Sequence, residues 1–429
     1  MVKINKNITA IVIIIFSCAL ANSLSFSSEF NQGTFQNTYF NNSLRLFNEN
    51  ISGYYLSPLF DAESPANWTG ISWNASLFGE LTNYQEENLM YGNILLFHLN
   101  NNFSDTSGNS NHGSCTFFNC PTYTQNGKLK GAYSFDGIDD IISANLVYGD
   151  NYTVSAWLKP NSLNTLEIYG RTIVASSPNS SLFYPIWFLA EGSKFRVYAY
   201  SSSSGSYVQS NYNNLSVGKW VHLIVSATKG GEAKIYVNGV LDKSFIAGNQ
   251  APNNYLSIGD LRPNRKLAFN GSIDEVVVWN RILTPEEVKE VYSRGIKKLN
   301  ISIKSCEEVN CINSDWENIN YKTPQEINLL EKRYFQYLIN FETENSSFSP
   351  ELYEFTLFYQ VPEFDKNNPT IITGGSLGGT KEYDKPGEKI VYYTPRSELI
   401  KALVFSLLIV VFIIFLILGL IYLGWRIFR

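Results

Sequence analysis

The cysteines are the residues whose spacing most directly suggests chemistry. Cys115 and Cys120 are separated by four residues, and Cys306 and Cys311 repeat that gap. The fifth cysteine, Cys18, lies in the predicted signal peptide. In an oxidising compartment, the even number of cysteines that remains indicates disulfides, and the short gaps favour a bond within each pair. Four cysteines can also bind one zinc ion, which is the alternative interpretation. Cys120 and Cys306 are 186 residues apart, which favours two local disulfides.

Side chains that could carry catalysis are sparse. The three histidines, His98, His112 and His222, are scattered and accompany no Gly-x-Ser-x-Gly nucleophile motif. Asp274 and Glu275 are adjacent in a predicted strand, so we expect them to face opposite sides of a sheet. They could not then act as the paired carboxylates of a retaining glycosidase, which stand about 5 Å apart. The sequence supplies no catalytic pattern, and we expect no enzyme activity.

Residues that could bind calcium through oxygen atoms are better represented than residues that could carry catalysis. Asp105 and Asn109 lie in a glycine-containing loop between predicted strands, and calcium binds six to eight such oxygens. The alternative for Asp105 is an Asx-turn that only shapes the loop. Asp136, Asp139 and Asp140 cluster in a second loop, where we expect them to shape a turn.

Aromatic side chains could provide a surface on which sugar rings stack. Trp187, Tyr198, Tyr200 and Tyr207 come from consecutive strand-like stretches and could share one face of a sheet. Aromatic residues also favour strands for packing reasons alone, so core packing is the alternative for each. A glycan-binding face and an ordinary core are therefore both compatible with this pattern.

These side chains must be positioned by a β-rich region between residues 93 and 295. Short alternating stretches are separated by Gly, Asn, Pro and Ser turns, which is typical of a sandwich or barrel. The stretches 233–237 and 240–245 flank Asn238-Gly239, a strong signal for a two-residue hairpin. Thr284, followed by proline and glutamate, predicts the start of one short helix that ends near Gly295.

Seven motifs in this region carry a family resemblance. They are Leu-Phe-His-Leu at 96–99, Asp-Thr-Ser-Gly-Asn at 105–109, Phe-Asp-Gly-Ile-Asp-Asp at 135–140, Val-Ser-Ala-Trp-Leu at 154–158, Gly-Lys-Trp-Val-His at 218–222, Tyr-Val-Asn-Gly at 236–239 and Phe-Asn-Gly-Ser-Ile-Asp-Glu-Val at 269–276. In this order and spacing, residues 90–296 resemble a laminin G-like domain of the concanavalin A-like lectin superfamily.

The resemblance implies a two-sheet jelly roll that is used mostly to bind glycans or proteins and is often stabilised by calcium. It also implies that the motif containing Asp274 lies near the 105–109 loop. Asp105, Asn109 and Asp274 are therefore the candidate calcium ligands, and calcium is the one expected cofactor. The alternative for Asp274 is a solvated carboxylate at the edge of a sheet.

The flanking segments 31–82 and 297–361 also read as strands, and neither has enough of them to close a core alone. Together they are similar to a small accessory β-sandwich of prokaryotic surface proteins. We therefore expect one discontinuous sandwich with the lectin-like domain inserted into one of its hairpins; the alternative is two independent half-domains. Insertion costs little when the ends of the inserted domain lie close together.

The two ends of the chain predict export and a membrane anchor. Residues 1–21 combine two lysines, an apolar run and a small-x-small site, which indicates a cleaved signal peptide rather than an uncleaved anchor. Residues 402–425 form an uncharged apolar run long enough to span a bilayer as a helix, whereas a buried core helix is the alternative. A stalk at 362–398 and a cytoplasmic tail at 426–429 complete a single-pass type I topology.

Composition narrows the partners. A formal charge of −5 and a pI near 5.5 argue against nucleic acid as a partner, because phosphate binding requires a basic surface. The expected function is a membrane-anchored cell-surface protein that presents a lectin-like domain to an extracellular glycan or surface protein. A structural envelope component that binds no sugar is the alternative, and a polysaccharide-active enzyme is a third.

Overall fold

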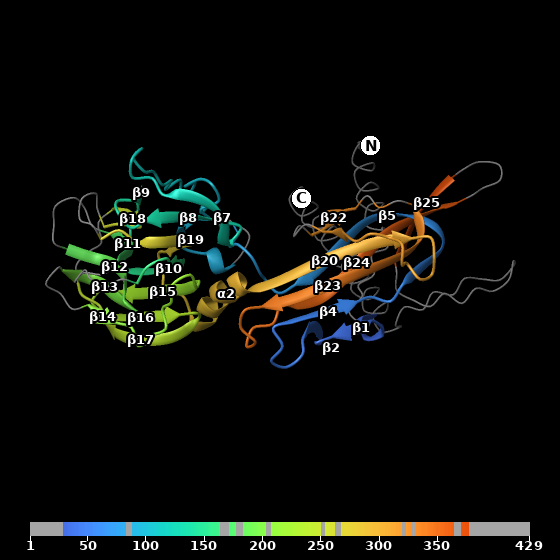
Figure 1. Cartoon of the computed structure of the whole chain (residues 1–429), viewed down its shortest axis with the longest axis horizontal. Helices are drawn as coiled ribbons and strands as arrows, with labels where there is room; N and C mark the ends of the chain where they lie inside the picture. The colour runs from blue at the N-terminus through green and yellow to red at the C-terminus, as the bar shows by residue number, and fades with distance from the viewer. Residues whose placement is uncertain are drawn as a thin grey trace, which may run out of the picture.

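The computed structural model describes residues 29–82, 88–163, 171–176, 183–202, 207–249, 254–261, 267–319, 323–327, 329, 331–363 and 370–376. Within these ranges strands dominate, and the helical elements are α2 (Pro285–Ile296) and two short 3-10 turns, η1 (Glu29–Gln32) and η2 (Asn88–Met90). The predicted all-β class is confirmed. Figure 1 shows the strands gathered in two bodies along the long axis, with α2 between them.

The first body, residues 88–296, contains two sheets. One has eight strands, β6 (Asn93–Phe97), β7 (Thr122–Leu129), β8 (Gly131–Asp136), β10 (Asn151–Pro160), β15 (Val221–Thr228), β16 (Glu232–Val237), β17 (Val240–Ile246) and β19 (Asn270–Trp279). The other has six strands, β9 (Ile142–Ala144), β11 (Arg171–Ser176), β12 (Phe183–Glu191), β13 (Lys194–Ser202), β14 (Val208–Gln209) and β18 (Leu256–Ile258). Apolar side chains of both sheets form one core, as in a sandwich.

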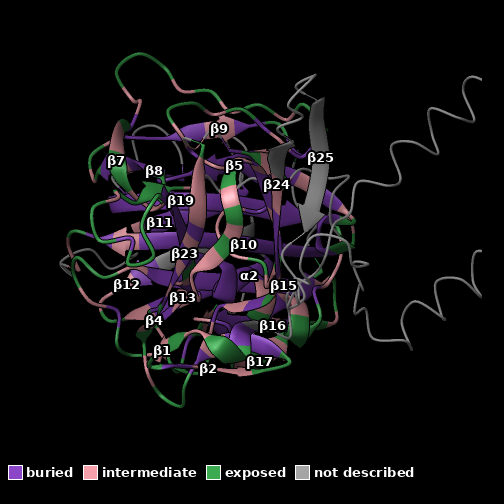
Figure 2. Ribbon diagram, turned by 90° about the vertical axis from the view of Figure 1, so that its right-hand side faces the viewer, coloured by how far each residue is buried: buried purple, intermediate pink, exposed green. Residues whose placement is uncertain are grey.

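In the eight-stranded sheet the strand order is β17-β16-β15-β10-β19-β8-β7, with β6 paired to β19. In the six-stranded sheet it is β14-β13-β12-β11-β18-β9. Strands β10, β15 and β19 are buried along almost their whole length, which Figure 2 shows by colour. Burial on both sides means that the eight-stranded sheet has one face toward the sandwich core and the other face covered.

Two local sequence signals act as expected. Asn238 and Gly239 join β16 to β17 with φ angles of 50° and 75°, the left-handed values that a type I′ hairpin turn requires. At the start of α2, the Thr284 hydroxyl accepts a hydrogen bond from the Glu287 amide, and the Glu287 carboxylate accepts one from the Thr284 amide. Both predictions are confirmed. The helix ends at Ile296, and β20 (Lys297–Cys306) begins at the next residue.

The second body combines strands from before and after the first. The strands before it are β1 (Thr34–Gln36), β2 (Thr38–Asn41), β3 (Ser43–Leu46), β4 (Ser52–Leu56) and β5 (Phe60–Ala75). The strands after it are β20, β21 (Glu317–Asn318), β22 (Gln325–Glu326), β23 (Lys332–Thr343), β24 (Glu351–Glu363) and β25 (Thr370–Ser376). Strand β23 pairs with β4 and β5, and β24 pairs with β3 and β5. Strands from the two flanks are therefore direct neighbours.

Strand β5 bends so that its two halves join different layers. Its first half pairs with β23, and its second half pairs with β24. Tyr337 of β23 and Phe355 of β24 stack between the layers with ring centroids 4.1 Å apart. Strand β20 lies in the β23 layer, paired to β23 and β21. Strands β5 and β20, which flank the inserted region, do not pair with each other, so the expectation that the insertion interrupts a hairpin is wrong: the chain leaves from one layer and returns into the other.

The predicted signal peptide 1–21, the transmembrane segment 402–425, the tail 426–429 and most of the stalk 362–398 lie outside the described residues. Among the residues that are described, no helix is both long and apolar enough to cross a membrane. Part of the predicted stalk is regular instead, because β24 extends to Glu363 and pairs with β25.

Replacement of Phe335 by alanine tests the core that the two flanks share. Phe335 of β23 is fully buried, and its ring centroid lies 5.1 Å from that of Trp68 of β5. We expect Phe335→Ala to lower the free energy of unfolding of this body by about 3–5 kcal/mol. The exposed Tyr353→Ala serves as the control and should cost less than about 1 kcal/mol. Equal denaturant midpoints for the two variants would contradict a joint core.

Candidate functional site

Asp105 organises the loop after β6 through hydrogen bonds to protein groups. Its Oδ1 accepts from the amides of Leu96 and Ser107, each at 2.9 Å. Its Oδ2 accepts from the Ser107 hydroxyl at 2.9 Å and from the Asn111 amide at 2.8 Å. Both oxygens are thus occupied, as in the Asx-turn alternative. Asn109 also has local partners, since its side-chain amide donates to the Asn93 carbonyl and the Ser107 hydroxyl.

Asp274 is likewise held by backbone amides. Its Oδ2 accepts from Lys128 and Leu129 of β7, at 2.8 and 2.9 Å, and its Oδ1 accepts from Glu275 at 2.8 Å. Burial, together with the neighbouring Glu275, raises the pKa of Asp274 well above its ordinary value. Asp105 and Asp274 belong to neither of the groups of potential metal ligands among the described residues. Asp105, Asn109 and Asp274 thus each have hydrogen-bond partners within the protein, and calcium binding by these residues stays a prediction.

The predicted turn around Asp136 is present. Asp136 Oδ1 accepts from the Ile138 amide at 2.7 Å, and Asp140 Oδ2 accepts from the Asp136 amide at 2.8 Å. These bonds are the reason that Asp136, Asp139 and Asp140 approach one another.

The four aromatic candidates do not share a face. Tyr198 lies in a small cluster with Ala175, Leu261 and Leu267, whereas Tyr200 is fully buried in the main core, where its hydroxyl donates to the Gly149 carbonyl. The reason is the left-handed φ of 51° at Tyr200, which interrupts the alternation of β13. Tyr200 is therefore corrected to a core residue. The side chain of Trp187 lies outside what the structure describes.

Tyr207 is the aromatic candidate at the surface, with 47% of its area exposed. Its ring lies against Tyr198, and the Arg196 guanidinium sits 4.1 Å from its centroid. The Glu191 carboxylate accepts hydrogen bonds from Arg196 and from the Gln209 amide. The outer face of the six-stranded sheet thus presents one aromatic ring beside polar groups, a combination suited to a sugar.

A second exposed aromatic surface was not predicted. The local disulfides are confirmed, and Cys115–Cys120 closes a loop whose tip carries Phe117 and Phe118, exposed to 91% and 86%. The two rings meet edge to face at 5.3 Å. Asn119 bonds this loop to the neighbouring turn, where Ile138 is 67% exposed. We call Phe117, Phe118 and Ile138 the apolar tip. Two adjacent phenylalanines between cysteines were the available sequence signal.

The outer face of the eight-stranded sheet carries charge because of a β-bulge in β19. Ser155 pairs with Val277, but Trp157 pairs with Asp274, so β19 has one extra residue at this point. Glu275 adopts the left-handed φ of 47°, and Ile273 and Val276 both enter the sandwich core. Asp274 and Glu275, which lie between Ile273 and Val276 in the strand, therefore both face outward. The expectation that they face opposite sides is wrong, because it assumed an uninterrupted strand.

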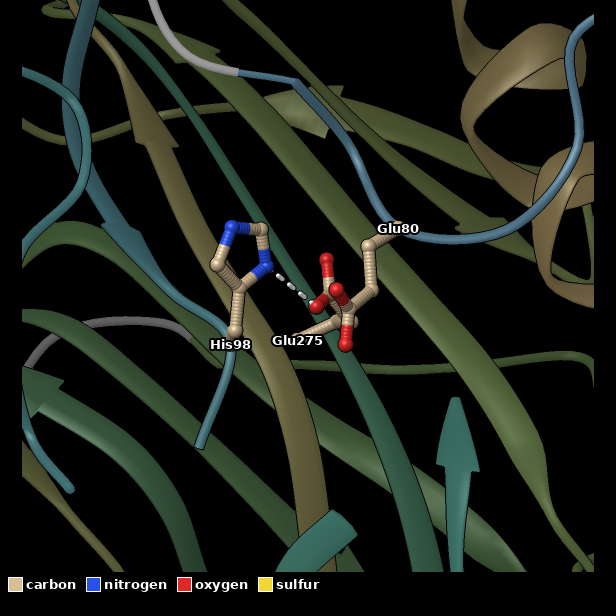
Figure 3. Close-up of side chains that lie close together, drawn as sticks. All are labelled: Glu80, His98 and Glu275. Atoms are coloured by element: carbon tan, nitrogen blue, oxygen red, sulfur yellow. Dashed lines mark hydrogen bonds and ion pairs between the residues drawn. The ribbon is translucent and has the colours of Figure 1, made fainter. Parts of the chain in front are cut away.

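Glu275 meets two residues from other segments at this face. Its Oε1 lies 2.6 Å from His98 Nδ1, just after β6, and Glu80 approaches from the connection that follows β5. The nearest donor atoms of the three residues all lie within 4.8 Å of one another, and Figure 3 shows the side chains converging. Burial alone would lower the pKa of His98, but the Glu275 carboxylate outweighs it and raises the pKa above its ordinary value.

His222 lies in a stack of rings on the same face. Its ring centroid lies 4.6 Å from that of Trp157 and 5.9 Å from that of Tyr292 of α2, and the Trp157 and Tyr292 centroids are 5.7 Å apart. Its Nε2 is 2.8 Å from the Ser155 hydroxyl, and its buried Nδ1 has no hydrogen-bond partner in the part of the chain that the structure describes. Burial, with the nearby Lys128, lowers the pKa of His222 to about 3. The neutral imidazole is thus part of the packing under α2.

The comparisons agree with the sequence motifs. Residues 136–289 match the family described as the concanavalin A-like lectin/glucanases superfamily, which confirms the predicted resemblance for this region. The human adhesion G-protein coupled receptor D1 is 32% identical over 84 residues, which are 18% of this chain. The match spans about a tenth of that receptor's length.

Several solved structures are similar to parts of this chain, with TM-scores of 0.40 or less. Domain 4 of an extracellular arabinanase from Geobacillus stearothermophilus, in complex with arabinotriose, is 23% identical, with a TM-score of 0.34 over 47% of this chain and 98% of that chain. The ligand-binding domain of botulinum neurotoxin serotype D, in complex with N-acetylneuraminic acid, is 16% identical, with a TM-score of 0.40 over 67% of this chain and 71% of that chain. The binding domain of Paraclostridial Mosquitocidal Protein 1 is 14% identical, with a TM-score of 0.39 over 48% and 53%.

Acid should destabilise the fold through His222. The pKa of His222 is lowered in the folded state, so the unfolded chain binds a proton first as pH falls below about 6.5. The stability present above pH 6.5 is then lost progressively toward pH 3, by about 5 kcal/mol in all. We expect the free energy of unfolding, measured with urea, to differ less between pH 7 and pH 4.5 in His222→Gln than in the unchanged protein. His112→Gln, at an exposed site, should leave the difference intact.

Proposed function

We propose that this chain is a membrane-anchored cell-surface binding protein whose lectin-like body recognises a glycan or a protein outside the cell. The match to a lectin superfamily supports a binding role for this body. The sequence patterns at 1–21 and 402–425 support export and a single-pass type I anchor. In this proposal most of the chain is extracellular.

The observation that carries the proposal is the apolar tip. Large apolar side chains that are almost fully exposed are costly to hydrate, and contiguous patches of them mark interaction sites. Here the exposed rings stand on a loop closed by a disulfide and bonded to the neighbouring turn. Because the loop is fixed before a partner arrives, little conformational entropy is lost on binding. Phenylalanine rings can stack on sugars or fill an apolar pocket of a protein.

The strand pairings support the proposed organisation of the chain as a lectin-like domain, about 90–296, inserted into a discontinuous sandwich, about 31–82 and 297–361. Both ends of the inserted part enter the same accessory body, in strands β5 and β20. Two connections restrict rotation of the inserted domain more than a single linker would. Such an arrangement suits a module that presents a binding surface in a fixed orientation.

Alanine substitution of the tip should abolish partner binding without affecting the fold. We expect the double variant Phe117→Ala/Phe118→Ala to bind its best target on a glycan or extracellular-protein array at least about 10-fold more weakly. Its denaturant midpoint should be unchanged, because both rings are exposed. Ile246→Ala, on the edge strand β17 and 76% exposed, is the matched control. Equal binding by both variants would refute the apolar tip as the binding surface. Native assemblies of a protein that binds nothing on the array would favour the alternative function, a structural envelope component.

The proposed topology predicts a defined mature protein. In cells that express the full chain, mass spectrometry should find an N-terminus at Asn22, and the protein should remain in membranes washed with alkaline carbonate. Protease added outside intact cells should remove the epitopes of the lectin-like body. Protection of these epitopes, or release of the protein by carbonate, would contradict a type I anchor.

A further inference from the structure

We propose that Glu80, His98 and Glu275 bind one divalent transition-metal ion, such as zinc, through His98 Nδ1 and one oxygen of each carboxylate. An imidazole and two carboxylates form a donor set that zinc accepts. This site is distinct from the predicted calcium loop, and one of its ligands comes from outside the lectin-like body. It does not depend on the proposed function.

The spacing of the donor atoms is compatible with an ion. They already lie within 4.8 Å of one another, and His98 Nδ1 is 2.6 Å from Glu275 Oε1. Ligands in a tetrahedral zinc site stand about 3.3 Å apart, as follows from metal–ligand bonds of about 2.0–2.1 Å. The His98–Glu275 pair would open by a few tenths of an ångström, and Glu80 would close in slightly. Rotation of side chains supplies movements of this size.

The surroundings suit a site that binds an ion and retains it. The side chains of Glu80, His98 and Glu275 are only 13%, 17% and 5% exposed. One oxygen of Glu275 has no hydrogen-bond partner among the described residues, although the side chain is nearly buried. Glu275 also lines a cavity of about 10 Å³ beside Ser155, His222 and Arg294. That is about the space of one water molecule beside Glu275, although Glu80 and His98 are not among the residues that line it.

Neighbouring groups contact both carboxylate oxygens of Glu80, and one of these groups, the Lys130 ammonium, is free to move away. The Asn100 amide donates to Glu80 Oε1 at 2.5 Å, and the Arg294 guanidinium donates to the Glu80 carbonyl at 2.6 Å. Contacts of this kind orient metal ligands. Lys130 also contacts Glu80, but its side chain is 69% exposed and can move into solvent. The acidic turn, by contrast, brings together three carboxylates and no imidazole, so it does not offer the same donor set.

The charge balance also suits a divalent ion. The carboxylates of Glu80 and Glu275 together neutralise its charge. Lys130, whose side chain is 69% exposed, can leave Glu80 for solvent.

The full chain in detergent, stripped with a chelator and dialysed, should bind zinc chloride with one equivalent at pH 7.5 by isothermal titration calorimetry and elemental analysis. Cobalt(II) in place of zinc should give the visible absorption of a four-coordinate site. Glu275→Gln should lower affinity about 100-fold or more, since it removes a ligand, and Asp139→Asn in the acidic turn is the matched control. Glu80→Gln, in a connection rather than a strand, covers the case in which Glu275→Gln does not fold.

Each result decides the proposal. Loss of the single equivalent in either glutamate variant, with the Asp139→Asn protein unchanged, supports the site. Absence of zinc binding in the unchanged protein, or binding that survives both glutamate substitutions, overturns it and leaves His98 and Glu275 as an ion pair. The array result for the apolar tip has a different readout, so failure of one proposal does not imply failure of the other.

Discussion

The β-bulge at Glu275 determines how the lectin-like body meets the rest of the chain. A strand that alternated without interruption would direct one of Asp274 and Glu275 into the apolar core, where an unpaired carboxylate is costly. The extra residue places both carboxylates on the outer face of the eight-stranded sheet. There, Asp274 accepts three backbone amides, and Glu275 pairs with His98. A single irregular residue therefore allows an apolar sandwich to carry a charged outer surface.

That surface is covered rather than solvated. Helix α2 and the connection after β5 pack on it through an apolar cluster that includes Leu81, Val277 and Val291. Beside this cluster, Lys128 lies over the Trp157 ring and contacts Glu344, which follows β23. Phe348 packs against Tyr292 of α2. Polar and apolar contacts thus join the two bodies over the region where the chain passes between them.

Local signals in the sequence predict the elements well, because the residues that form them are neighbours in the chain. The hairpin at Asn238, the cap at Thr284 and the two disulfides all depend on residues within five positions of one another. The superfamily motifs identify the lectin-like region for a similar reason. The features that the sequence did not predict depend on irregular backbone conformations or on residues that are far apart in the chain. Left-handed residues at Tyr200 and Glu275 reverse the face that simple alternation assigns, and Glu80 reaches its neighbours only through the folded arrangement of three segments.

The direct passage from α2 into β20 has a mechanical consequence. Ile296 ends the helix and Lys297 begins the strand, so no slack chain separates them. Ten consecutive residue pairs then join β20 to β23 side by side, a geometry in which traction along the strand loads many hydrogen bonds together instead of peeling them singly. A force that pulls on a ligand bound to the lectin-like body would pass through the rigid junction between α2 and β20. It would then load the hydrogen bonds between β20 and β23 in shear.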